Sequence, residues 1–218
     1  MKAFTRATSI AVPIDGINVN TDQIIPARFL KASRAAGYGG FLFHDLRFDG
    51  EGAPRPDFVL NMPAFRDGRI LVVDANYGCG SSREGAVYAH QDYGIVAILA
   101  PSFGDIFYNN CLKNGLVPVV LDGGVLAETR RHLHLKGGEI TVDLEALEAT
   151  LPDGARHRFE IEPFWRECIL KGLDEISLTS TYEPQIRAFE DAYHAQVPWV
   201  RKPEVDLGRE GHEDRKVP

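Results

Sequence analysis

The chain of 218 residues is 44% hydrophobic and 25% charged, which is the composition of a soluble globular protein. Its formal net charge of −7 argues against binding to a nucleic-acid backbone, because that binding needs clustered lysine and arginine. No apolar run reaches the roughly 18 residues of a membrane span. The first ten residues also lack the apolar core of a secretory signal, so we expect a cytoplasmic protein.

The predicted elements begin with short strands at residues 9–14 and around Ile24 and Ile25. From residue 69 on, continuous apolar runs alternate with helical stretches, a pattern typical of βαβ units in a covered parallel sheet. The predicted strands are residues 69–74, 95–100 and 116–121, and the predicted helices between them are residues 81–94 and 101–115.

The remaining elements follow a different pattern. Residues 125–134 predict a helix, and the alternating runs at 139–144 and 157–162 predict a hairpin around residues 151–156. Further helical stretches are expected near residues 164–171 and 184–193. We therefore expect one domain over residues 1–200, followed by a charged tail at 201–218.

The stretch "NYGCGSSREG", residues 76–85, stands between a predicted strand and a predicted helix. Gly78 and Gly80 permit a tight turn with positive φ and the close approach of a ligand. A helix beginning near Ser81 would direct free N–H groups into the turn, and Arg83 would add a bidentate fork. The combination favours an anion site, although a turn that serves packing alone is the alternative.

Familiar phosphate and nucleophile motifs do not fit this loop. The dinucleotide pattern G-x-G-x-x-G requires glycine where Arg83 stands, and the P-loop lysine is absent. The nucleophile elbow G-x-S-x-G requires glycine where Glu84 stands. A Cys79 nucleophile would need a histidine partner, and the sequence identifies none.

A serine in this loop can instead act as a base if its alkoxide is stabilised by nearby N–H donors and an arginine. Such a base could remove a proton from a carbon next to a carboxylate that Arg83 holds. Loss of a hydroxyl in the same reaction would need an electrophile, most simply a metal. The three cysteines, Cys79, Cys111 and Cys168, are scattered and form no iron–sulfur or zinc ligand pattern, so we expect no metal site in this chain.

The loop, together with "NVNTDQIIPARFLK" at residues 18–31 and "GLDEISLTSTYEPQIRAFEDAYHAQVPW" at 172–199, resembles the small subunits of 3-isopropylmalate dehydratases. That family is similar to the swivelling domain of aconitase, and the resemblance covers almost the whole chain. It implies an α/β fold, a three-layer β/β/α swivelling domain with βαβ units. It also implies a hydro-lyase of leucine biosynthesis that interconverts 2- and 3-isopropylmalate.

The resemblance also implies roles for individual residues. Ser81 takes the position of the catalytic base, and Ser82 and Arg83 take positions that hold a substrate carboxylate. The segment after "TDQIIPARFL" would reach over the substrate, which points to Lys31 and, less directly, to Arg28 and Arg34. Surface charge without a role is the alternative for those three.

The resemblance further implies a partner. In this family a separate large subunit carries a [4Fe–4S] cluster, which would supply the missing electrophile, and the two chains form a heterodimer or heterotetramer. This chain would bind no cofactor and would be inactive alone.

Two positions depart from the family pattern: Gly85 stands where histidine is usual, and Asn20 where aspartate is usual. They leave open a related substrate such as citraconate, maleate or homoaconitate. A stand-alone anion-binding module and a Cys79-dependent hydrolase or transferase are the alternatives from other classes.

Overall fold

The computed structural model describes residues 1–200, which fall into two compact units, Met1–Glu175 and a second unit from Ile176 on. The predicted charged tail, residues 201–218, lies outside the described residues, and the single domain expected over residues 1–200 stays a prediction.

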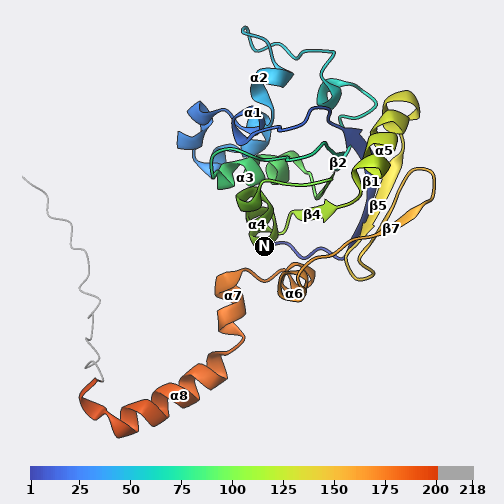
Figure 1. Cartoon of the computed structure of the whole chain (residues 1–218). Coiled ribbons are helices and arrows are strands. Elements are labelled where there is room, and N and C mark those ends of the chain that lie inside the picture. The colour runs from blue at the N-terminus through green and yellow to red at the C-terminus, as the bar shows by residue number, and fades with distance from the viewer. Residues whose placement is uncertain (201–218) are drawn as a thin grey trace, which may run out of the picture. The chain divides into compact units, whose positions relative to one another are not determined.

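The first unit is built on a seven-stranded sheet with the order β4-β3-β2-β1-β5-β6-β7 (Figure 1). Strands β1, β2, β3 and β4 pair parallel with one another in that order. Strand β1 also pairs antiparallel with β5, and β6 pairs antiparallel with both β5 and β7. The strand bounds are β1 (Arg6–Pro13), β2 (Ile70–Val72), β3 (Ala97–Ala100), β4 (Val117–Val120), β5 (Glu139–Asp143), β6 (Glu148–Thr150) and β7 (Arg156–Arg158).

Strand β1 belongs to both halves of the sheet. Its residues Ala11–Pro13 pair with β2, and its residues Arg6–Ile10 pair with β5. The sheet therefore changes from parallel to antiparallel within a single strand.

Six α-helices accompany this sheet in the first unit as far as it is described. They are α1 (Thr21–Ile24), α2 (His44–Arg47), α3 (Glu84–Tyr93), α4 (Asp105–Asn114), α5 (Gly123–Lys136) and α6 (Pro163–Lys171). Short 3₁₀ turns cover Ala27–Lys31, Arg34–Ala36, Tyr38–Phe41 and Val59–Asn61. In the second unit, α7 (Glu175–Ser180) begins at the boundary and is followed by α8 (Glu183–Gln196) and a turn at Pro198–Val200.

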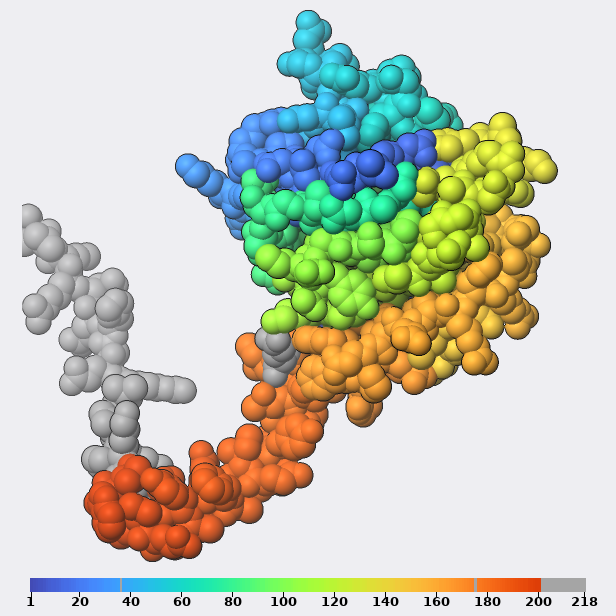
Figure 2. Space-filling view, viewed as in Figure 1, coloured from blue at the N-terminus to red at the C-terminus, as the bar shows by residue number. Residues whose placement is uncertain are grey.

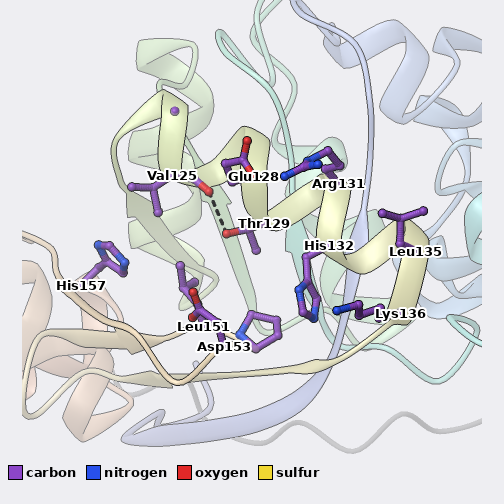
Figure 3. Close-up of a pocket in the computed structure, with 12 residues that line it drawn as sticks. Val125, Glu128, Thr129, Arg131, His132, Leu135, Lys136, Leu151, Asp153 and His157 are labelled. Atoms are coloured by element: carbon purple, nitrogen blue, oxygen red, sulfur yellow. Dashed lines mark hydrogen bonds and ion pairs between the residues drawn. The ribbon is translucent and has the colours of Figure 1, made fainter.

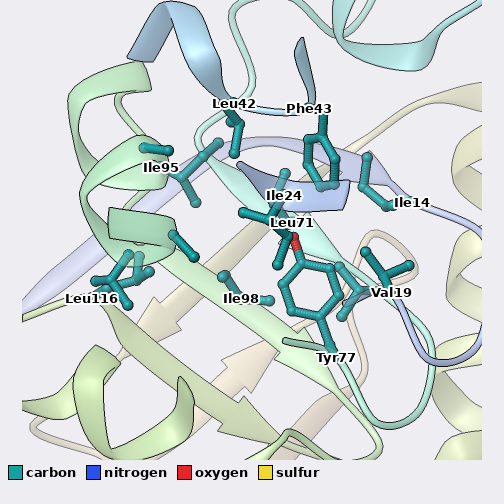
Figure 4. Packing of buried hydrophobic residues seen from close by; sticks show 14 of the residues in the cluster. Ile14, Val19, Ile24, Leu42, Phe43, Leu71, Tyr77, Ile95, Ile98 and Leu116 are labelled. Atoms are coloured by element: carbon teal, nitrogen blue, oxygen red, sulfur yellow. The ribbon is translucent and has the colours of Figure 1, made fainter. Parts of the chain in front are cut away.

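The parallel strands bury both faces, and alternate residues enter two different cores. Val12, Leu71 and Ile98 face the core that contains α1 and α3, where Ile24 and Tyr77 pack beside them (Figure 4). The neighbouring strand residues enter a second core with α5 and the antiparallel strands; they include Ala11, Ile70, Val72, Ala97 and Leu99. Helices, parallel strands and antiparallel strands thus give the expected three-layer β/β/α arrangement.

The space-filling view shows the surface of the β6–β7 segment, in orange, beside that of α5, in yellow-green (Figure 2). A cavity of about 620 Å³ lies between α5 and the β6–β7 turn (Figure 3). Its wall includes Leu135 and Leu151 together with Arg131 and His157. Arg131 pairs with Glu128 at the surface of the same helix, and the hydroxyl of the buried Thr129 in this wall donates to the Val125 carbonyl oxygen at 2.8 Å.

The strands at residues 9–14, 69–74, 95–100 and 116–121 are confirmed, as are the helix ends at Gly94 and Gly115, which both adopt positive φ. Three expectations about this region are wrong. Residues around Ile24 form helix α1, because Asn20 and Gln23 make a capping box. Helices α3 and α4 begin at Glu84 and Asp105, later than the predicted starts at Ser81 and Pro101.

The hairpin expected from two strands contains a third. Strand β6 is only three residues long, and it pairs with both β5 and β7. The predicted turn at residues 151–156 is therefore the β6–β7 connection. The helices expected near residues 164–171 and 184–193 are confirmed as α6 and α8.

Candidate active site

The candidate site lies where the loops after β1, β2 and β3 meet, at the carboxyl edge of the parallel strands. Gly78 N donates to the Val19 carbonyl oxygen at 2.7 Å, and Thr21 N donates to that of Cys79 at 2.9 Å. On the other side, Gly104 N donates to the Tyr77 carbonyl oxygen at 2.8 Å. These bonds extend the parallel pairing beyond the strands, and ligands in open α/β sheets bind at this edge.

Glycine is required at two positions of the loop after β2. Gly78 has φ of +72°, and an added Cβ would lie 2.3 Å from Phe107 Cγ. Gly80 has φ of +93°. The positive φ expected at both glycines is confirmed, and Phe107 is buried against the loop as a packing residue.

A small cavity of about 210 Å³ opens at this loop. Ser81, Ser82 and Arg83 line it together, and its remaining wall comes from Thr21, residues 78–80 and residues 104–107. Both serines are exposed, and within the described residues their hydroxyls have no hydrogen-bond partner. The three residues predicted to form the centre of the site are thus brought to one opening, with free hydroxyl groups.

Ser81 is fixed through its main chain by a residue that was not singled out from the sequence. Thr21 is 1% exposed, and its Oγ1 donates to the Ser81 carbonyl oxygen at 2.8 Å. Thr21 opens helix α1, so the "TDQ" sequence that contributed to the family resemblance also braces the serine loop. That resemblance was the only signal in the sequence that could have indicated this role.

Arg83 forms an ion pair with Asp22, the next residue of the same "TDQ" sequence. The Arg83 side chain is 14% exposed, whereas the Asp22 carboxylate is 55% exposed. The contact uses Nη1 of the guanidinium, and the group has further N–H donors for an incoming carboxylate. Asp22 thereby orients the fork that is predicted to hold substrate.

The start of α3 differs from the expectation on which the alkoxide argument depended. Arg83 is the N-cap and has an extended backbone, so Ser81 and Ser82 lie in the turn before the helix. Glu84 occupies the first turn and adds a negative charge beside the free N–H groups. The main source of positive charge near Ser81 and Ser82 is therefore the Arg83 guanidinium, and the N-terminal end of α3 contributes less.

The three cations of the segment after "TDQIIPARFL" have different environments. Arg28 forms an ion pair with Asp45, and the hydrogen bonds from its guanidinium lower the pKa of the Asp45 carboxyl to about 2. Arg34 lies 3.9 Å above the Tyr88 ring and 3.6 Å from an Asp92 carboxylate oxygen. Lys31 is exposed and has no ion pair within the described residues.

None of these three side chains lines the cavity beside Ser81. Arg28 and Arg34 are occupied by carboxylates of their own chain, so Lys31 has the charge most available to a ligand. The assignment of all three to the substrate stays a prediction.

The cysteines do not form a cluster site. Cys79 lies in the serine loop with its Sγ 3.4 Å from the Asn18 carbonyl oxygen, whereas Cys111 and Cys168 are buried on helices α4 and α6. Burial raises the pKa of the Cys111 thiol well above its ordinary value, which favours the protonated form. Among the described residues no group of three or more histidine, cysteine or acidic side chains could hold a metal ion. The residues present therefore do not fit an iron–sulfur cluster.

Comparison with known proteins places this fold and loop in a defined class. Residues 1–124 match the aconitase C-terminal domain family, which makes the chain an aconitase-type swivelling domain. It is 48% identical over 201 residues to the 3-isopropylmalate dehydratase small subunit of Rhodospirillum centenum, with 92% of this chain and 99% of the relative covered. The corresponding subunit of Hahella chejuensis is 45% identical, with 92% and 98% covered.

A solved structure agrees with these relatives. The crystal structure of 3-isopropylmalate dehydratase from Methanocaldococcus jannaschii has a TM-score of 0.61 and 26% identity, and the match covers 84% of this chain and 99% of that one. The chain belongs to the family of 3-isopropylmalate dehydratase small subunits. In the described part of the chain, no helix combines the length and apolar character needed to cross a membrane.

Proposed function

We propose that this chain is the small subunit of a heteromeric hydro-lyase that interconverts 2- and 3-isopropylmalate in leucine biosynthesis. The observation that carries the proposal is the shared opening of Ser81, Ser82 and Arg83 at the carboxyl edge of a family fold. The names of the two relatives described above supply the substrate class.

In this proposal Arg83 binds a carboxylate of the substrate and Asp22 holds the guanidinium in position. Two N–H groups of the guanidinium match the two oxygens of a carboxylate, and a charge-assisted pair of this kind is stronger than neutral hydrogen bonds. The free hydroxyl of Ser82 adds a donor on the same side of the cavity.

Ser81 is proposed to take the proton from the carbon next to that carboxylate, while the hydroxyl on the neighbouring carbon departs. Return of water in the opposite orientation would give the isomeric acid. The alkoxide form of a serine needs nearby positive charge, and Arg83 and the N–H groups before α3 are the groups available here. The Thr21 hydrogen bond holds the main chain of Ser81 while the proton moves.

A separate large subunit is proposed to carry the [4Fe–4S] cluster, which would act as the Lewis acid on the departing hydroxyl. A partner is implied by the small-subunit family, and the open cavity with free serine hydroxyls is consistent with a site that a second chain closes. Whether the pair is a heterodimer or a heterotetramer stays a prediction, as does the cytoplasmic location.

The test is reconstitution. The chain purified alone is expected to give no isomerisation of 2-isopropylmalate, and activity is expected after anaerobic addition of a large subunit with an intact cluster. A parallel assay with citraconate, maleate and homoaconitate identifies the preferred acid. Turnover by the isolated chain, or a reconstituted complex that does not act on 2-isopropylmalate, would contradict the proposal.

A further inference from the structure

We propose that Arg130 is a positioning residue of the candidate site, although it lies outside the cavity at Ser81. It joins the bases of the two loops that carry Thr21 and Ser81, and so sets how the tips of these loops meet. The inference rests on the proposed function and adds a residue that contacts neither the substrate nor the reacting groups.

Arg130 is a buried cation on α5, a helix that packs against β1 and β2 from the side of the second core (Figure 1). The residue is only 9% exposed, and among the buried residues that the structure describes it is the one with a permanent charge. A buried guanidinium is tolerated only where carboxylates and carbonyl oxygens satisfy it. The groups that satisfy Arg130 therefore show which parts of the chain it holds.

The guanidinium of Arg130 contacts the bases of both loops. Its Nη1 donates to the Val73 carbonyl oxygen at 2.8 Å and its Nη2 to Asp74 Oδ2 at 3.0 Å, and these two residues directly follow β2. Its Nε lies 3.4 Å from Oδ1 of Asp15, two residues beyond the end of β1. His134, one turn further along α5, lies 2.7 Å from Oδ2 of the same carboxylate. Helix α5 thus fixes the spacing of the two chains where they leave the sheet.

Beyond these contacts the two loops pair with each other up to the cavity. Asn18 N donates to the Ala75 carbonyl oxygen at 3.0 Å, and the Asn76 side-chain amide donates to Asn18 Oδ1 at 2.8 Å. Asn18 and Asn76 have positive φ of +59° and +57°, so both chains turn at the same level. The bonds at Thr21 described above continue this pairing to Ser81. A change of spacing at the bases is therefore carried along paired chain segments to the tips.

The geometry of the site depends on both loops. Thr21 on the first loop holds the main chain of Ser81, and Asp22 on the same loop holds Arg83. If the loops separate at their bases, the proposed base and the carboxylate fork lose these supports. A misplacement of about 1 Å can lower a rate by about a hundredfold. Arg130 thus affects the rate through the position of the loops.

The experiment compares Arg130→Met with the matched control Arg166→Met in the reconstituted complex. Arg166 on α6 also donates to main-chain oxygens, those of Leu144 and Glu145 at 3.0 and 2.7 Å, but these residues follow β5. For Arg130→Met we expect kcat to fall by about tenfold to a hundredfold. For Arg166→Met we expect kcat to stay within about twofold, since the site is unchanged. Both variants should lower the urea midpoint, because each removes hydrogen bonds to the main chain.

Asp15→Asn provides a second variant that leaves the buried guanidinium in place. The Asp15 carboxylate is 64% exposed, so its replacement should not prevent folding. The variant weakens the link to the first loop alone, and kcat should fall by about threefold to tenfold.

A double-mutant cycle with Thr21→Val gives a readout that a merely structural role would not move. In the Thr21→Val complex the connection to Ser81 is already cut, so adding Arg130→Met should lower kcat by less than about threefold. The effects of the two substitutions on the urea midpoint should instead add. Effects on kcat that multiply in full would overturn the path through Thr21.

Hydrogen exchange of the isolated chain needs neither substrate nor partner. The amides of Asn18 and Gly78 donate from one loop to the other, and their exchange should accelerate in Arg130→Met and not in Arg166→Met. Unchanged exchange would overturn the role of Arg130 in holding the loops, and faster exchange with unchanged kcat would overturn its role in catalysis. A wild-type complex inactive on 2-isopropylmalate would overturn the proposed function instead. The exchange comparison would then still decide whether Arg130 joins the loops.

Discussion

Thr21 donates a 2.8 Å hydrogen bond to the carbonyl oxygen of Ser81, a residue 60 positions further along the chain. Thr21 follows β1 and Ser81 follows β2, and the two strands are parallel neighbours. One buried hydroxyl therefore joins two loops at the candidate site. Together with the Asp22–Arg83 ion pair, it makes the "TDQ" sequence a brace for the serine loop.

Replacing Thr21 with valine should lower kcat of the reconstituted complex by about tenfold to a hundredfold, because the loop that positions Ser81 loses a fixed point. The Ser81 carbonyl oxygen would lose its partner at a cost of about 1–3 kcal/mol in the free energy of unfolding. Steady-state kinetics and urea unfolding measure the two effects. Thr21→Ser keeps the donor and should restore kcat; a serine variant as impaired as the valine variant would contradict the assignment.

Replacing Ser81 with alanine should reduce kcat by about 10² to 10⁴-fold, the range associated with loss of a proton-transfer group. Ser81 is exposed and its hydroxyl has no partner in the described residues, so the fold should be unaffected. Ser82→Ala is the matched control and should act mainly on KM. Turnover retained in Ser81→Ala, measured in a complex shown to be assembled, would exclude Ser81 as the base.

Replacing Arg83 with lysine should raise KM by about tenfold to a hundredfold, because a bidentate fork becomes a single point charge. The ammonium group can still pair with Asp22, so the thermal unfolding temperature should change little. The measurement is a comparison of KM and kcat with calorimetry on the same preparation. A KM equal to that of the wild type would show that Arg83 does not hold the substrate.

His90 should make the stability of the chain depend on pH. Its ring is fully buried; Nδ1 donates to the Ala86 carbonyl oxygen at 2.7 Å, and Nε2 accepts from the Tyr77 hydroxyl at 2.8 Å. Burial lowers the pKa of His90 from 6.5 to about 4. The unfolded chain therefore takes up a proton below pH 6.5 that the folded chain does not accept until about pH 4.

The contribution of the neutral, buried His90 to the free energy of unfolding is complete above pH 6.5. It is lost as the pH falls toward 4, with a total of about 3 kcal/mol. Urea unfolding at a series of pH values measures it. The slope between pH 6.5 and 4 should decrease in His90→Gln, which does not titrate. Equal slopes in the two proteins would mean that His90 is not the responsible group.

The sequence predicts strands β2, β3 and β4 because each lies in a continuous apolar run, and it predicts the helix ends because Gly94 and Gly115 supply left-handed caps. Helix beginnings are less predictable. Ser81 and Ser102 are residue types that cap helices, but here their backbones belong to loops that pair with neighbouring loops. Such pairing depends on chain segments that are remote in sequence.

The candidate site likewise has a part that the sequence predicts and a part that depends on contacts between remote segments. Ser81, Ser82 and Arg83 are neighbours in the sequence, and their common opening follows from the turn that Gly78 and Gly80 impose. The sequence does not reveal that Arg28 is paired with Asp45 or that Arg34 lies over Tyr88. Strand β6 was missed because three residues with one buried side chain, Ala149, carry too little periodicity.

Strand β1 has a kinetic consequence for the whole first unit. Thr8 at its start pairs with Thr141 on β5, and the sequence separation of 133 residues is spanned by nearly the entire βαβ region. Contacts between residues so far apart in the sequence form slowly, because a long loop must close before they stabilise the chain. We expect the antiparallel half to assemble late in folding. A fragment ending after β4 would leave one edge of β1 unpaired and open to aggregation.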